Sequence, residues 1–269
     1  RAVVRIVGTL VENGSMIETT QTDAQNMQEP PWAARPWAGF DTETTGVSPH
    51  TDRLVSAAIV HRISPLSGEG EDRHLTSFSH HTWLADPGVA IPPTAAAIHG
   101  ITTEYARSHG QPVEVVTEEV VAALAEHFRS GGIVVVFNAG FDIPLLEAEA
   151  VRHDVPTLRS RLDTEVGPII DPLVLDRALD RFRKGKRTLS DLANVYGIEL
   201  PSDTHQAHVD AELTLKVAEA LVAKFPVLAE MTASEVHDFQ RTSHARWAED
   251  FESYLRKQGR TTTISRIWF

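Results

Sequence analysis

An acidic pair lies within the stretch Gly39-Phe40-Asp41-Thr42-Glu43-Thr44-Thr45-Gly46. In a β-strand, residues two positions apart project from the same face, so the carboxyl groups of Asp41 and Glu43 would point the same way. Two like charges on one face raise each other's pKa unless a cation lies between them, and Mg²⁺ and Mn²⁺ favour such oxygen ligands. The pair therefore predicts a divalent-metal site. The alternative is an acidic pair on the surface of an edge strand.

The same tripeptide occurs again at Asp163-Thr164-Glu165 and serves as an internal comparison. Arg159 and Arg161 precede this second copy, and no Thr-Thr-Gly follows it. We interpret it as a solvated segment paired with arginines. In the first copy, Thr44-Thr45-Gly46 predicts a turn in which the backbone can approach a ligand closely.

A second candidate is the stretch Asn138-Ala139-Gly140-Phe141-Asp142, directly after the β-branched run Ile133–Phe137. Such a run is typical of a strand buried on both faces. Because ligands of α/β sheets bind at the carboxyl ends of central strands, Asp142 is a candidate residue of a functional site. Its alternative is the ordinary acidic residue of a first helical turn. Phe141 either stacks on a base or belongs to the core, and the core is favoured.

A third candidate combines His205 and Asp210. Pro, Ser and Asp make residues 200–206 a predicted loop, whereas Asp210 lies on a helix with an apolar stripe. A histidine beside a reacting water can accept its proton, because the ordinary imidazole pKa of ~6.5 is close to neutrality. The alternative, in a chain with 13 histidines, is a loop histidine without a role. His208 is interpreted as structural.

These residues need a framework of strands and helices to bring them together. The first three predicted strands follow one another through short connections, which is typical of an antiparallel meander. The later order of helix, strand, helix, strand and further helices predicts an α/β protein with a mixed sheet flanked by helices. The predicted strands are 37–41, 54–63, 73–83, 133–137 and 166–171. The predicted helices are 113–128, 141–151, 172–183, 188–196, 207–224 and 232–258.

Composition excludes several classes of protein. The 269 residues are 42% hydrophobic, which suits one sizeable domain with appendages. There is no cysteine, so disulfides and thiolate metal sites are excluded, and a cytoplasmic location is the expectation. No apolar run approaches the ~20 residues of a membrane-spanning helix, and Arg5 and Gly8 interrupt any secretory signal. The net charge of −12 argues against nonspecific coating of nucleic acid.

The three candidates, in this order, resemble the motifs of the DEDDh exonucleases. Ile98-His99-Gly100-Ile101-Thr102 also resembles a segment typical of the epsilon proofreading subunit of bacterial DNA polymerase III and its relatives. The resemblance spans residues 36–225 and implies a ribonuclease H-like fold, 3′→5′ exonuclease activity and two divalent ions, Mg²⁺ or Mn²⁺. By this resemblance the metal ligands are Asp41, Glu43, Asp142 and Asp210, and the general base is His205. One departure is Phe137, where many relatives have His.

The resemblance also divides the chain and suggests how substrate is held. We predict a disordered N-terminal appendage or tag at 1–34, an exonuclease domain at 35–226 and a C-terminal helical extension and tail at 227–269. The terminal nucleotide at a DNA 3′ end would be gripped by Thr44-Thr45-Gly46. By family analogy, His99 and Ile101 would wedge its base.

The remaining features leave alternatives open. The run Arg177–Arg187 carries six cations and one acid, and it either follows the phosphate backbone or is a solvated helix end. The stripe Trp247, Phe251, Leu255 either packs on the domain, which is favoured, or meets a partner such as a DNA polymerase or sliding clamp. Three functions are weighed: a single-stranded DNA exonuclease of proofreading or repair, an RNA 3′-trimming enzyme, and a non-catalytic polymerase- or clamp-binding module.

Overall fold

The computed structural model describes residues 29–63, 77–201 and 205–269. The chain divides into residues 1–30 and a second unit, residues 31–269, to which the following description applies. Most of the predicted appendage, residues 1–28, and the start of the predicted third strand, residues 73–76, lie outside the described residues.

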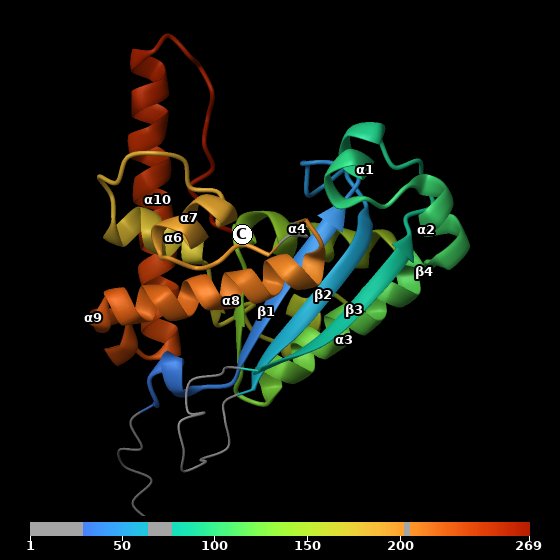
Figure 1. Cartoon of the computed structure of the whole chain (residues 1–269), viewed down its shortest axis with the longest axis horizontal. Helices are drawn as coiled ribbons and strands as arrows, with labels where there is room; N and C mark the ends of the chain where they lie inside the picture. The colour runs from blue at the N-terminus through green and yellow to red at the C-terminus, as the bar shows by residue number, and fades with distance from the viewer. Residues whose placement is uncertain (1–28, 64–76, 202–204) are drawn as a thin grey trace, which may run out of the picture. The chain divides into compact units, whose positions relative to one another are not determined.

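Within the described part, six strands form one mixed sheet in the order β4-β3-β2-β1-β5-β6 (Figure 1). β1, β2 and β3 pair antiparallel, as the meander predicted, whereas β5 and β6 continue from β1 in parallel. The carboxyl ends of β1, β5 and β6 therefore share one edge of the sheet. The strands are β1 Trp37–Thr44, β2 Leu54–Ile63, β3 Ser77–Asp86, β4 Gln111–Pro112, β5 Ile133–Val135 and β6 Ile169–Ile170.

Helices cover both faces of the sheet. α8 lies across one face, over β1 and β2, and α3 and α4 pack on the other (Figure 1). The helices are α1 Pro93–His99, α2 Thr103–His109, α3 Val113–Arg129, α4 Ala139–Arg152, α5 Leu158–Leu162, α6 Pro172–Leu179, α7 Leu189–Val195, α8 Ala207–Lys224, α9 Pro226–Glu230 and α10 Ala233–Lys257, with a 3₁₀ turn at Trp32–Ala34. Among these helices, none is long and apolar enough to span a bilayer.

β1 is longer than the sequence predicted, and the reason is pairing. Thr42 and Glu43 continue the ladder opposite Ala57 and Ser56 of β2, so the strand reaches Thr44 rather than ending at Asp41. Both acidic residues of the first candidate consequently lie on a regular strand and share one face, as the alternation requires.

A close approach of β1 and α8 depends on Gly39. A Cβ atom at this position would lie 2.5 Å from the backbone oxygen of Ala211, which is far inside van der Waals contact. The absence of a side chain therefore lets α8 lie against β1 and brings the residue before Ala211, Asp210, to the same face as Asp41.

The first predicted boundary needs correction, and the C-terminal extension packs on the domain. Trp32 is fully buried, its Nε1 donates to the Leu228 carbonyl at 2.6 Å, and its ring stacks on Trp37. The prediction that the appendage extends to residue 34 is therefore wrong for Trp32–Ala34, because this turn belongs to the core. Leu228 and Val236 are buried in that same apolar cluster, so the chain beyond residue 226 packs on the domain.

Candidate active site

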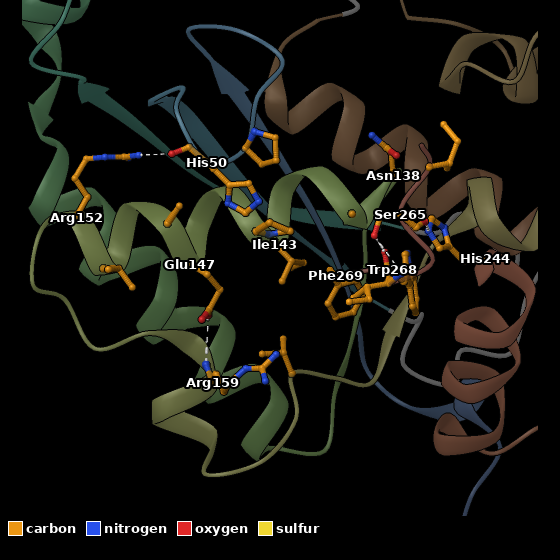
Figure 2. Close-up of a pocket in the computed structure, with 18 residues that line it drawn as sticks. His50, Asn138, Ile143, Glu147, Arg152, Arg159, His244, Ser265, Trp268 and Phe269 are labelled. Atoms are coloured by element: carbon orange, nitrogen blue, oxygen red, sulfur yellow. Dashed lines mark hydrogen bonds between the residues drawn. The ribbon is translucent and has the colours of Figure 1, made fainter. Parts of the chain in front are cut away.

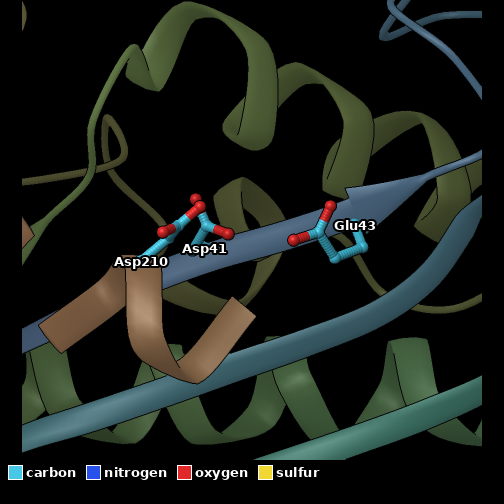
Figure 3. A group of neighbouring side chains, drawn as sticks. All are labelled: Asp41, Glu43 and Asp210. Carbon is cyan, nitrogen blue, oxygen red and sulfur yellow. The ribbon is translucent and has the colours of Figure 1, made fainter. Parts of the chain in front are cut away.

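Three carboxyl groups meet near the carboxyl end of β1. Asp41 and Glu43 project from one face of β1, and Asp210 lies in the first turn of α8, which covers that face. Each offers one carboxylate oxygen, and these oxygens lie within 4.8 Å of one another (Figure 3). Hard divalent ions bind oxygen at about 2.0–2.6 Å, so oxygens this close can share a cation.

Asp142 reaches this edge from the opposite face of β1. It lies in the first turn of α4, is 4% exposed, and its Oδ1 accepts a hydrogen bond from Thr42 Oγ1 at 2.5 Å. Thr42 stands between the two acidic residues of β1 and points away from them. Asp142 is thus outside the group of three oxygens, yet its charge acts on both Asp41 and Glu43.

The four carboxyl groups repel one another. Burial and the charges of Asp142, Glu43 and Asp210 hold the pKa of Asp41 well above its usual range. Burial, followed by the charges of Asp210 and Asp142, raises the pKa of Glu43 to about 8. Burial raises the pKa of Asp142 to about 7 against the hydrogen bond from Thr42, and burial also raises the pKa of Asp210. This concentration of acid favours a bound cation.

The one ion pair of this cluster within the described residues involves His205. Its Nδ1 lies 4.0 Å from Asp210 Oδ2, and the imidazole opposes the rise in the Asp210 pKa. The histidine is on the predicted loop, its side chain is 55% exposed, and its φ of 72° is left-handed. His208 instead lies beside the ring of His80, with centroids 5.7 Å apart.

Comparisons with known proteins agree with this arrangement. A family model described as "Exonuclease" (RNase_T) matches residues 38–218, which is more than half of the chain. The chain belongs to the exonuclease family. This assignment confirms the resemblance to the DEDDh exonucleases.

The relatives of this exonuclease include replication proteins. It is 26% identical to the PolC-type DNA polymerase III of Lacticaseibacillus paracasei over 96% of this chain and 16% of that one. It is 28% identical to a DNA polymerase III subunit epsilon-like protein of Rhodobacter capsulatus over 70% of this chain and 23% of that one. The chain thus spans less than a quarter of the length of these two relatives.

Solved structures similar to the exonuclease include exonuclease I. One superposes with a TM-score of 0.58 at 19% identity, covering 73% of this chain and 42% of that one. Another, Escherichia coli exonuclease I in complex with a dT13 oligonucleotide, gives a TM-score of 0.56 at 19% identity, covering 78% and 44%. With the mixed sheet, these likenesses confirm the predicted ribonuclease H-like fold.

The turn after the acidic pair of the exonuclease is held by internal bonds. Thr44 Oγ1 donates to the Gly46 carbonyl at 2.6 Å, and Thr45 Oγ1 donates to Asp52 at 3.0 Å. A Cβ atom on Gly46 would lie 2.6 Å from the Asp52 carboxylate. The two hydroxyl groups order the turn that ends β1, and contact of Thr44-Thr45-Gly46 with a terminal nucleotide stays a prediction.

The other residues expected at substrate also pack into the protein. His99 is 7% exposed, its Nδ1 accepts from the Ile101 backbone N–H at 3.1 Å, and burial lowers its pKa, with the Thr44 backbone opposing the shift. Ile101 packs on a small cluster of apolar side chains beside β2. Phe141 is partly buried against the main core, which agrees with its core interpretation.

Sequence reasoning missed Asp171, a buried carboxylate at the same edge of the sheet. Asp171 follows β6 and caps α6, accepting from the Leu173 backbone N–H at 2.9 Å. It also accepts from the N–H groups of Asn138 and Ala139 at 3.1 and 2.9 Å, across the turn that starts α4. Asn138 has a left-handed φ of 65°. Asp171 therefore fixes the turn that presents Asp142, and its place before Pro172 was the available sequence signal.

The C-terminal extension closes on Asp171 from the other side. Gln240 of α10 accepts from the Asp171 N–H at 2.6 Å and donates to the Ile169 carbonyl at 2.9 Å. Trp268 Nε1 donates to Asp171 Oδ2 at 3.3 Å. Trp268 also borders a cavity of 940 Å³ between α4 and the C-terminal segment (Figure 2). The extension is consequently part of the support of the site.

Two other interpretations of the sequence are resolved by ion pairs. The second Asp-Thr-Glu copy, residues 163–165, is exposed as predicted, but Arg161 pairs with Glu118 of α3. Its expected pairing with arginines is therefore wrong for Arg161.

In the basic run, Arg183 and Arg187 both pair with the buried Asp176. Much of the predicted positive patch is thus neutralised inside the fold.

Proposed function

We propose that this chain is a metal-dependent 3′→5′ exonuclease that hydrolyses single-stranded DNA from its 3′ end and releases nucleoside monophosphates, in proofreading or repair. The observation that carries the proposal is the convergence of Asp41, Glu43 and Asp210 oxygens within 4.8 Å. The similarity to a PolC-type DNA polymerase III and to a DNA polymerase III subunit epsilon-like protein supports DNA as the substrate.

The donor set fits a pair of divalent ions. Every candidate ligand is a carboxylate, and burial together with mutual repulsion raises the pKa of Asp41 and Glu43, a cost of ionisation that a bound cation would offset. We propose Asp41, Glu43, Asp142 and Asp210 as the ligands of two ions, Mg²⁺ or Mn²⁺. Such ions, when bound, neutralise charge on the scissile phosphate and on the leaving 3′ oxygen.

His205 is proposed as the general base. Its imidazole is exposed and lies 4.0 Å from Asp210, so it borders the cluster while remaining open to solvent. The Asp210 carboxylate would orient the ring and stabilise the imidazolium that forms when His205 takes a proton from the attacking water. The loop position would let the base move away as product leaves.

Digestion of labelled single-stranded DNA with Mg²⁺ or Mn²⁺ tests this proposal. A 5′ label should yield a ladder that shortens from the 3′ end, and a 3′ label should appear at once as a mononucleotide. Asp41→Asn and Asp210→Asn should abolish hydrolysis, whereas Asp163→Asn, in the exposed second copy of the motif, should retain it. Retained turnover in Asp41→Asn would refute the assignment.

An RNA strand of the same sequence discriminates the alternatives. Faster cleavage of RNA would favour the 3′-trimming enzyme, and no cleavage of either strand would favour the binding module. His205→Ala should lower the rate at neutral pH by about 10²–10⁴-fold, the range for a general base. An unchanged pH–rate profile would contradict that role.

A further inference from the structure

A groove of 530 Å³ lies between α6 and α10, outside the carboxylate cluster. One wall carries Arg177, Arg181 and Phe182, and the other carries Arg246, Trp247 and Phe251. The groove therefore combines aromatic rings with arginines. Neither feature is needed by the core, since the buried residues of this part of α10 are Ala248, Glu252 and Leu255.

The rings of α10 form a row of nearly parallel faces. Trp247 and Phe251 have centroids 5.3 Å apart and planes 14° from parallel, and Phe251 and Tyr254 follow at 6.4 Å and 14°. Tyr254 is 56% exposed, and Phe182 across the groove is 89% exposed. Large aromatic faces gathered in solvent mark an interaction site rather than ordinary surface.

The arginines lie among these rings. The Arg177 guanidinium is 3.9 Å from the centroid of the Trp247 ring, and Arg181 lies over Phe182 while pairing with Asp250. Arg246 is exposed and forms no ion pair with any residue that the structure describes. Exposed Lys184 follows in the loop after α6. The groove is thus a positive site on a chain whose net charge is −12.

The groove adjoins the catalytic edge of the sheet. α6 begins directly after Asp171 at the carboxyl end of β6, which is parallel to β5 and, through it, to β1. Burial lowers the pKa of Arg177, and the nearby charge of Asp171 opposes that shift. Figure 1 shows α6 against α10 on the β6 side of the sheet. The groove therefore begins within one helix, α6, of the carboxyl ends of these strands.

We propose that the α6–α10 groove binds the single strand on the 5′ side of the scissile bond. Bases stack on the exposed rings of Phe182, Phe251 and Tyr254, and phosphates lie near Arg181 and Arg246. Parallel ring faces interleaved with cations are the pattern of sites that hold single strands without reading sequence. The inference rests on the proposed function, because a 3′ end in the site directs the rest of the strand outward on its 5′ side.

The test compares the binding of oligo-dT of 4 and 16 nucleotides by fluorescence anisotropy in Mg²⁺, with every protein carrying Asp41→Asn so that no hydrolysis occurs. The shorter strand fills the catalytic edge, and the longer one also reaches the groove. The double variant Phe251→Ala/Arg246→Ala should lower the ratio of 16-mer to 4-mer affinity about tenfold, as expected for the loss of one stacked base. For the double variant, the slope of log affinity for the 16-mer against log salt concentration should become less steep by about 0.7.

Arg129→Ala is the charge-matched control, because it lies at the end of α3 that precedes β5, at the opposite edge of the sheet. It should leave the affinity ratio unchanged. The single variant Phe182→Ala, whose side chain is 89% exposed, provides a groove variant free of folding effects. Its affinity ratio should fall at least threefold.

The outcomes separate the two proposals. If the wild type degrades DNA and neither groove variant changes the affinity ratio, the groove assignment is overturned, the proposed function stands, and a protein partner becomes the occupant to seek. If the wild type neither binds nor degrades DNA of either length, the proposed function fails and the inference fails with it. A lower ratio in both groove variants, with the control unchanged, supports the groove.

Discussion

Raising the pH from 7 to 9 in the absence of divalent ions should destabilise the protein through its carboxylate cluster. The folded-state pKa of Glu43 is raised from 4.5 to about 8, and that of Asp142 from 3.8 to about 7. In the unfolded chain both groups are already ionised at pH 7, so the folded state binds more protons. Stability contributed by the protonated groups is therefore lost as the pH rises through the folded-state values.

The size of the effect follows from these two values. From pH 7 to pH 9, the ionisation of Glu43 in the folded state lowers the free energy of unfolding by about 1.4 kcal/mol. This is the value for one proton bound by the folded but not the unfolded state over one pH unit. Asp142 adds about 0.4 kcal/mol, because it is already half ionised at pH 7. At about 2–4 °C per kcal/mol for a domain of this size, the melting temperature should fall by about 5 °C.

Histidines make an opposing contribution at the start of this window. Burial lowers the pKa of His61, His99, His127, His237 and His244 in the folded protein. These groups make stability rise with pH as the unfolded chain loses its imidazole protons, and that rise is nearly complete above about pH 7.5. The informative quantity is therefore the difference between the wild type and a variant of the cluster.

Differential scanning calorimetry of the wild type and Glu43→Gln, in EDTA at pH 7, 8 and 9, measures this difference. The variant cannot ionise at this position and lowers the repulsion on its neighbours, so its pH slope should be less than half that of the wild type. Glu165→Gln makes the same change in the exposed second Asp-Thr-Glu copy and should keep the wild-type slope. Equal slopes in all three proteins would refute the raised pKa of Glu43 in the folded cluster.

Millimolar Mg²⁺ at pH 9 extends the same experiment. Binding of a cation to the folded state alone raises stability by mass action, and it does so where the carboxylates are ionised. The wild-type melting temperature should rise on addition of Mg²⁺, and that of Glu43→Gln should rise less. A response as large in the variant as in the wild type would place the ion elsewhere.

Three further substitutions test the supports of the site by urea unfolding. Gly39→Ala would put a Cβ atom 2.5 Å from the Ala211 backbone oxygen and should cost about 1–3 kcal/mol, because α8 must shift. Gln240→Leu leaves the Asp171 N–H and the Ile169 carbonyl without partners and should cost about 2–4 kcal/mol. Trp268→Phe removes one donor from the Asp171 carboxylate and should cost about 1.5–3 kcal/mol.

Exposed positions supply the controls for these supports. Gln258→Leu at the exposed end of α10 should change stability by less than about 0.5 kcal/mol, in contrast to Gln240→Leu. Val227→Ala, on the half-exposed surface of α9, serves in the same way for Gly39→Ala. A neutral Gly39→Ala would mean that α8 adapts without losing its contact to β1.

The sequence by itself determined the local pattern of this protein. The alternation along β1 puts Asp41 and Glu43 on one face, and the β-branched run before Asn138 produces the buried strand β5. The order of the motifs pointed to the exonuclease family, which the family match confirmed. These features could be predicted because the periodicity of a strand or helix is a property of a short segment, and the order of motifs is read directly along the sequence.

Tertiary structure decided which distant groups meet. Gly39 against Ala211 brings Asp210 to the face of Asp41, whereas Asp142 arrives on the other face and is held by Thr42. Two cations of the basic run, Arg183 and Arg187, were turned inward by Asp176, a pairing that no local pattern encodes. The supports at Asp171 and the groove along α10 depend on contacts between segments far apart in sequence. Such contacts follow from packing and polar satisfaction across the whole domain, and neither can be read from one segment.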